Sequence, residues 1–303
     1  MMRHRFVALL MLSAVTALPS PVAAALVPAA VDSTLIAALF RRSGKVRLVP
    51  LSAERALART HLPELLGLSR ATGERPDGRV RAAEIPLGSH VQQTSFVPLI
   101  PFAAKRNGVL RGYRIGWWPS EPRGRRKAKS ATPLPDGFIE VHASDTAAAV
   151  SEQFRLGDFL THDQRAVWPK YLVLKPDLLD KLELMSVELR GRGLPSKLRV
   201  MSGFRTPQYN ARGVGRRGGR AKDSRHMYGD ASDVFVDADD DGMMDDLDGD
   251  GRRTTADAGV LLDVGETVEA AHPELVGGLS AYKATSAHGP FVHVDVRGMR
   301  ARW

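Results

Sequence analysis

The sequence predicts an α+β fold in which a largely antiparallel sheet occupies residues 146–303, preceded by a small β-rich module at residues 91–145. Apolar residues recur at helical spacing over 178–189, and two glycines follow as a stop signal. LRVMSGF, residues 198–204, alternates like a strand, and VGETVEAAHPEL, residues 264–275, predicts a second helix. Strands and helices do not follow a repeating βαβ order, so an antiparallel sheet is expected.

The predicted module consists of short β-type runs. SFVPLIPFA, GVLRGYRIGWWP and GFIEVHA are separated by Asn-Gly, Pro and Pro-Asp-Gly turn signals. Trp117 and Trp118 could stack on a sugar or could pack against the rest of the module. Residues 25–90 read as a helical or linker region, with a helical stretch near Leu51–Leu68 and no assigned role.

Residues 1–24 have the pattern of a cleavable signal peptide. Arg3 and Arg5 precede an apolar run from Phe6 to Leu18, and small residues follow at 22–24. That run is shorter than the ~20 apolar residues that cross a bilayer, and no later segment supplies them. A periplasmic or secreted protein without a transmembrane anchor after cleavage is therefore expected. The chain has no cysteine, so neither disulfides nor cysteine-linked lipid can hold it.

Positive charge is concentrated in two loop-like stretches of a chain whose net charge is +9. Basic side chains crowd residues 123–129 and 212–225, among Gly and Pro. They are either solvated loops or a surface attracted to an anionic partner such as the cell envelope. Nucleic acid is not expected as a partner, because export removes the protein from it and no nucleic-acid motif accompanies the charge.

The most informative segments are SRHMYGDASD, residues 224–233, and FVHVDVR, residues 291–297. A zinc hydrolase needs about three His, Asp, Glu or Cys ligands and one open position. His226, Asp233 and His293 supply such a set. Because side chains alternate along a strand, His293 and Asp295 share one face while the intervening valines face the core.

SGFRTPQYN (residues 202–210), S-x-H-x-x-G-x-A-x-D and GPFVHVD together resemble, in order and spacing, the zinc D-Ala-D-Ala peptidase family. This family includes vancomycin-resistance dipeptidases, phage endolysin peptidases and the hedgehog signalling domain. The resemblance covers about 154–297, including FRLGDFL, and excludes the β-rich module. It implies a hedgehog/D-Ala-D-Ala-peptidase-like domain that holds zinc through His226, Asp233 and His293.

The resemblance also implies catalytic roles. Zinc in that family activates water for attack on a peptide carbonyl. Arg205, from the SGxR motif, is expected to stabilise the oxyanion, or alternatively to pair with a turn carboxylate. Many relatives carry a carboxylate three residues before the last zinc His, where this chain has Pro290. His288 is therefore the preferred general base and Asp295 the residue that orients a ligand, although the two roles could be exchanged.

An acidic segment, residues 237–257, follows the Asp233 strand and fits a calcium-loop pattern twice. The two registers share residues, so two full sites are not assumed. So dense a carboxylate cluster repels itself without a cation, which favours calcium over a plain solvated loop. The expected calcium ligands are Asp237, Asp239, Asp241, Asp245, Asp246, Asp248, Asp250 and Asp257.

These predictions combine into an exported zinc metallopeptidase that cleaves peptide bonds in peptidoglycan stems or cross-links, as carboxypeptidase or endopeptidase. The alternative is a non-catalytic cell-wall-binding module that keeps the peptidase fold and metals and adheres through its tryptophans and basic loops. Metal analysis combined with cleavage of purified walls separates the two.

Overall fold

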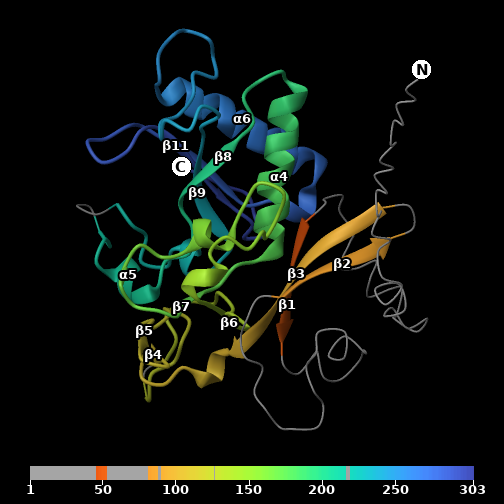
Figure 1. The fold of residues 1–303 in the computed structure, drawn as a ribbon. Helices are drawn as coiled ribbons and strands as arrows, with labels where there is room; N and C mark the ends of the chain where they lie inside the picture. The colour runs from red at the N-terminus through yellow and green to blue at the C-terminus, as the bar shows by residue number, and fades with distance from the viewer. Residues whose placement is uncertain (1–45, 53–80, 88–89, 126, 216–218) are drawn as a thin grey trace, which may run out of the picture.

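The computed structural model describes residues 46–52, 81–87, 90–125, 127–215 and 219–303 (Figure 1). The predicted signal peptide lies outside these residues. The strands are β1 (Val46–Ser52), β2 (Arg81–Leu87), β3 (His90–Pro101), β4 (Val109–Leu110), β5 (Tyr113–Arg114), β6 (Gly137–Val141), β7 (Lys170–Leu172), β8 (Leu198–Ser202), β9 (Ala231–Val236), β10 (Gly278–Tyr282), β11 (Phe291–Asp295) and β12 (Ala301–Arg302). The α-helices are α4 (Pro176–Gly191), α5 (Pro207–Ala211) and α6 (Thr255–Ala271), and the 3-10 turns are η1 (Phe102–Ala104), η2 (Ala143–Asp145), η3 (Leu156–Phe159), η4 (Arg225–Tyr228) and η5 (Pro273–Leu275).

The first sheet has the order β1-β3-β6-β7, with β2 also paired to β3. β1 runs parallel to β3, and the other pairs are antiparallel. The assignment of 25–90 as helix or linker is wrong at β1 and β2. Both form long ladders with β3, and local helical spacing does not report such distant pairing. The predicted helix near Leu51–Leu68 has its first two residues in β1 and otherwise lies outside the described residues.

The second sheet has the order β12-β10-β11-β9-β8 and contains the segments singled out in the sequence. Its pairs are antiparallel except for β10 with β12. His293 of β11 lies opposite Asp233 of β9 in the register. The mixture of separate helices and antiparallel sheets makes the described chain an α+β protein.

α6 covers one face of the second sheet, and α4 packs against α6. α4 begins with Pro176 in its first turn, and α6 contacts β10, β11 and α4. The helix predicted over residues 264–275 starts earlier, at Thr255, because Thr254 and Asp257 form a capping box there. It ends at Ala271, and η5 follows it. Figure 1 shows α4 and α6 beside each other, next to the strands of this sheet.

A single core connects residues on both sides of the boundary predicted at 145/146. Phe138 and Trp118 belong to the same buried cluster as Met185 and Val292. The first sheet also crosses this boundary, because β6 pairs with β7. β4 and β5 form only a two-residue hairpin in the run where a longer strand was expected. No helix in the described part of the chain is long and apolar enough to span a membrane.

Candidate metal centre

Three side chains from the two central strands and η4 converge on one point. His226 Nε2 lies 3.2 Å from Asp233 Oδ1 and 3.2 Å from His293 Nδ1, and His293 Nδ1 lies 3.0 Å from Asp233 Oδ1. All three residues are buried. Ligand atoms about 2.0–2.1 Å from a tetrahedral zinc lie roughly 3.3 Å apart, so this triangle has the size of a metal-binding site.

Hydrogen bonds behind the two imidazoles determine which nitrogens face the triangle as acceptors. His226 Nδ1 lies 2.7 Å from the carbonyl oxygen of Gly203, which can only accept, so His226 donates from Nδ1. His293 Nε2 lies 3.1 Å from Asp295 Oδ2 and donates to that carboxylate. The remaining nitrogen lone pairs face Asp233 Oδ1. Three acceptors at this distance repel one another unless a cation or a proton lies between them.

The protonation states of His226 and Asp233 suit a cation. Burial lowers the pKa of His226, and this outweighs the raising effect of Asp233, so its ring is neutral at pH 7. Burial alone would raise the pKa of Asp233, but its contacts with His226 and His293 and the charge of Arg205 hold it well below its usual value. A neutral imidazole and an ionised carboxylate are the forms that bind a divalent metal. Burial would lower the pKa of His293, but its bonds to Asp233 and Asp295 raise it, so a metal bound here would displace a proton from that ring.

Glycines in two of the sequence motifs allow the close packing that positions His226. A Cβ at Gly203 would lie 2.6 Å from the Cα of Phe159, so only glycine lets β8 approach η3. Gly229 ends η4 with φ +68, and a Cβ there would meet the carbonyl of Val173 at 2.4 Å. The backbone therefore turns sharply between His226 and the strand that carries Asp233.

Arg205 lies beside the triangle and pairs with one of its members. Its Nη2 donates to Asp233 Oδ2, and its Nε donates to Ser202 Oγ at 2.9 Å. Asp233 thus presents Oδ1 to the triangle while Arg205 holds Oδ2. Arg205 therefore pairs with a carboxylate on β9 and not with one in a turn, and its stabilisation of an oxyanion stays a prediction.

Asp295 lies behind His293, on the same strand face, as its spacing predicted. It is fully buried, and it accepts hydrogen bonds from Gly278 N at 2.7 Å, from Arg297 Nε at 2.9 Å and from His293. Burial would raise its pKa, but bonds from His293 and Arg297 lower it far below the usual value. A buried, fully bonded carboxylate orients His293 and has no lone pair left for a water.

His288 lies on the β10–β11 turn, separate from the triangle. Its Nδ1 lies 2.8 Å from Gly289 O, and its ring meets Phe291 edge-on at 5.0 Å between centroids. Phe291 is two residues before His293 on the same strand face. Among the described residues, His288 forms no hydrogen bond to the three candidate ligands, so its role as base stays a prediction.

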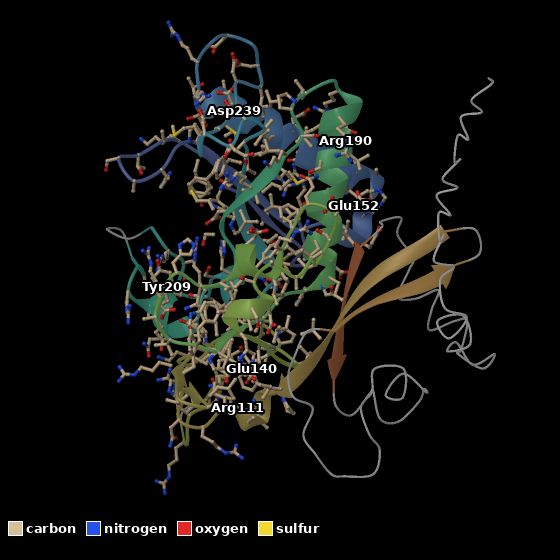
Figure 2. The ribbon with its side chains drawn as sticks, viewed as in Figure 1. Arg111, Glu140, Glu152, Arg190, Tyr209 and Asp239 are labelled. Atoms are coloured by element: carbon tan, nitrogen blue, oxygen red, sulfur yellow. The ribbon has the colours of Figure 1, made fainter. Side chains whose placement is uncertain are left out.

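The acidic segment forms two separate carboxylate groups in place of two overlapping loops. One contains Asp237, Asp239 and Asp245, and the other contains Asp246, Asp248 and Asp250. Burial and the charges of Asp239 and Asp237 raise the pKa of Asp245. Figure 2 shows Asp239 at the opposite end of the molecule from Arg111.

The structure does not bring Asp241 and Asp257 into these groups. Asp241 pairs with Arg253 instead. Asp257 is buried at the start of α6, where its Oδ2 accepts from Thr254 N at 2.6 Å and its Oδ1 from Leu247 N at 2.7 Å. Asp257 therefore links the segment to α6.

Sequence reasoning missed an aromatic group beside the triangle. The ring of Trp303 lies 5.2 Å from that of His293, and its Nε1 donates to the Tyr282 hydroxyl at 2.6 Å. Tyr282 stacks on Phe291 at 4.7 Å, with an angle of 3° between the rings. Both Trp303 and Tyr282 are exposed. Strand alternation could have placed Tyr282 on the His293 face, but no sequence signal brings Trp303 there.

Comparisons of the chain with protein-family models, with curated proteins and with solved structures each found no match. The case for a function therefore depends on the chemistry and geometry of the described residues.

Proposed function

We propose that this protein is an exported zinc peptidase of the D-Ala-D-Ala peptidase type, which hydrolyses peptide bonds in peptidoglycan stems or cross-links. The observation that supports it most is the buried His226–Asp233–His293 triangle, whose acceptors converge at the spacing of a tetrahedral zinc. The order of the motifs that carry these residues supports the assignment to this type and to its fold. Two nitrogens and one carboxylate oxygen are a common ligand set of catalytic zinc.

The surrounding residues would divide the remaining work. Zinc, when bound, supplies Lewis-acid chemistry that polarises a carbonyl and acidifies water. Asp295 fixes the ring of His293, and Arg205 fixes the carboxylate of Asp233. His288, on the adjacent turn, would move the proton. Trp303 and Tyr282 would form the wall against which the substrate peptide lies.

Calcium is proposed as a second, structural metal. The two carboxylate groups of the acidic segment offer only hard oxygen ligands, which calcium prefers. The segment joins β9, which carries Asp233, to α6, which supports β10 and β11. Bound calcium would therefore stiffen one border of the candidate metal centre.

Export and the cell-wall substrate are supported by the sequence alone, through the signal-peptide pattern of residues 1–24 and the motif resemblance. The anionic cell envelope remains the proposed partner for the basic loops. An adhesive module that keeps the metals is the competing function, and its outcome is included in the test below.

The test uses defined muropeptides and the purified protein with measured metal content. We expect about one zinc per chain and release of fragments identifiable by mass spectrometry. His226→Ala should lose both the zinc and the cleavage, whereas His272→Ala, a histidine distant in sequence from the motifs, should keep both. Zinc binding and wall binding without any cleaved bond would instead establish the adhesive module. Full zinc occupancy in His226→Ala would refute the ligand assignment.

A further inference from the structure

A hollow distinct from the metal triangle lies where the two basic stretches of the chain meet. It has a volume of about 320 Å³, at the lower end of the ~300–1,000 Å³ typical of small-molecule sites. Trp117, Arg123 and Lys129 line it from the segment after β5, and Asn210 and Lys222 line it from α5 and the loop beyond. These segments also contact each other directly, since Gln208 N donates to Ile115 O at 3.0 Å. Figure 1 shows α5 next to β4 and β5 at this end of the molecule.

The lining carries an excess of positive charge. Arg123, Lys127, Lys129 and Lys222 line the pocket together with one acid, Glu121. Both oxygens of Glu121 lie 2.7 Å from the buried ammonium of Lys105, so its charge is already neutralised. In the described part of the chain, neither Lys127, Lys129 nor Lys222 forms an ion pair, and the pocket therefore attracts an anion.

One residue that lines the pocket also holds a buried polar atom without a partner. Asn210 is 1% exposed, and its Nδ2 donates to Ala221 O at 3.0 Å. Its Oδ1 has no hydrogen-bond partner among the described residues. An unsatisfied buried acceptor costs about 1–3 kcal/mol, and a hydroxyl or N–H of a ligand would recover this energy.

The aromatic residues narrow the ligand further. Trp118 is buried and donates from Nε1 to Met227 O at 2.8 Å, so it belongs to the wall. Trp117 is only partly buried, and Arg123 lies 4.6 Å from its ring centroid. Together with Pro207 and Val214, Trp117 adds apolar surface to the pocket. Positive charge, an unsatisfied acceptor and apolar walls together fit a small molecule with an acid group, hydroxyls and a carbon skeleton.

We propose that this pocket binds an anionic saccharide unit, a sugar that carries a carboxylate or a phosphate. The acid group lies among Arg123, Lys129 and Lys222, and a sugar hydroxyl or amide N–H donates to Asn210 Oδ1. Binding does not require the metal triangle, so it persists in the His226→Ala protein and can be tested separately from peptidase activity.

Calorimetric titration of the full chain with four probes tests the proposal. N-acetylmuramic acid and N-acetylglucosamine 6-phosphate carry an acid on a sugar, N-acetylglucosamine lacks the acid, and inorganic phosphate lacks the sugar. We expect at least one of the two acidic sugars to bind at least tenfold more tightly than either control. The sugar that binds more tightly shows whether the preferred acid group is a carboxylate or a phosphate. Equal binding of the neutral sugar, equal binding of phosphate, or no binding by any probe would overturn it.

Variants locate the binding. Lys129→Gln combined with Lys222→Gln should weaken the acidic sugar at least tenfold, because both cations line the pocket and neither has an ion-pair partner in the described chain. Lys283→Gln combined with Arg190→Gln removes the same charge elsewhere and should leave affinity unchanged. Asn210→Ala should weaken the binding of the acidic sugar but leave the binding of inorganic phosphate unchanged. Equal loss in the two double variants would show only a general charge effect and would refute the site.

Discussion

Asp295 is the residue whose position is most informative about the candidate metal centre. It lies behind His293, fully buried, with hydrogen bonds from that ring, from Arg297 and from Gly278 N. Because His293 donates from Nε2 to Asp295, the neutral form of this ring has its lone pair on Nδ1, which faces the triangle. The carboxylate acts through His293 and touches neither the proposed metal nor the substrate.

Asp295→Asn should weaken zinc binding by about 10–100-fold, because a neutral amide holds the ring of His293 less firmly and does not favour its metal-binding tautomer. Competition against a chelator of known affinity measures the effect. Asp263→Asn, at an exposed pair with Arg192, is the control and should not change zinc affinity. An Asp295→Asn protein that holds zinc as tightly as wild type would contradict the positioning role.

His288→Ala should lower kcat by about a hundredfold or more while the zinc content stays unchanged, because general-base catalysis contributes typically 10²–10⁴. Steady-state kinetics on a defined muropeptide together with metal analysis measure both quantities. His272→Ala, at the C-terminal end of α6, is the matched control. Full turnover by His288→Ala would remove this histidine from the mechanism.

At the scale of elements, the acidic segment acts as the connection between β9 and α6. Asp245 N donates to Val236 O at the end of β9, and Asp257 caps α6 at the other end. The side chain of Met243 also approaches the β10–β11 turn, 3.5 Å from where a Cβ on Gly289 would lie. The segment therefore lies next to the turn that carries His288.

Calcium should raise the melting temperature through this segment. At a hundredfold excess over Kd the expected stabilisation is about 2.7 kcal/mol, and zinc should not replace calcium at oxygen ligands. Differential scanning calorimetry with and without millimolar calcium measures it. Asp246→Asn should lose part of the gain, whereas Asp136→Asn, outside the segment, should keep it. A melting temperature that does not respond to calcium would eliminate this site.

The pairing of α6 with the chain end predicts an acid-dependent stability. Hydrogen bonds from Arg302 lower the pKa of Glu266 to about 2, below the usual 4.5, although burial acts in the opposite direction. A carboxyl group whose pKa is lowered by folding stabilises the folded protein above pH 4.5. This contribution to stability is lost as pH falls from 4.5 toward 2. At 1.36 kcal/mol per pKa unit, the contribution of Glu266 to stability is at most about 3 kcal/mol. Solvent screening of this partly exposed pair reduces it to roughly 1–2 kcal/mol.

Melting curves of wild type and Glu266→Gln between pH 6 and pH 2.5 measure this contribution. The variant should be less stable at pH 6, and the two proteins should converge at the acid end. Glu188→Gln, at an exposed pair on α4, serves as the control. A difference that stays constant across the range would contradict the linkage.

At the scale of the whole molecule, the first sheet joins the predicted module to the predicted peptidase domain. β6 pairs with β7, and Tyr171 donates to Glu140 Oε2 at 2.8 Å in the interior. A fragment of residues 146–303 would expose this edge and the core behind it. We expect it to lack a cooperative melting transition, whereas residues 90–303, which keep β3 and β6, should melt cooperatively. Equal melting of the two fragments would show that the boundary separates independent units.

The sequence was sufficient for the residues whose role depends on local pattern. Strand alternation placed His293 and Asp295 on one face, and apolar spacing located α4. Contacts between distant segments were not predictable in this way. β1 and β2 owe their extended form to β3, and Trp303 reaches His293 only because β12 pairs with β10. Local spacing carries no information on such pairings.

Met227 connects the two candidate sites. It follows His226 in η4, lines the proposed saccharide pocket, and accepts there the hydrogen bond from Trp118 at its carbonyl. One peptide unit therefore joins the two candidate sites, and any coupling between them must be mutual. Thermodynamic reciprocity then applies. Whatever factor a bound acidic sugar applies to zinc affinity, bound zinc must apply the same factor to sugar affinity. Titrating either ligand in the presence of the other gives this coupling free energy twice, from two independent measurements.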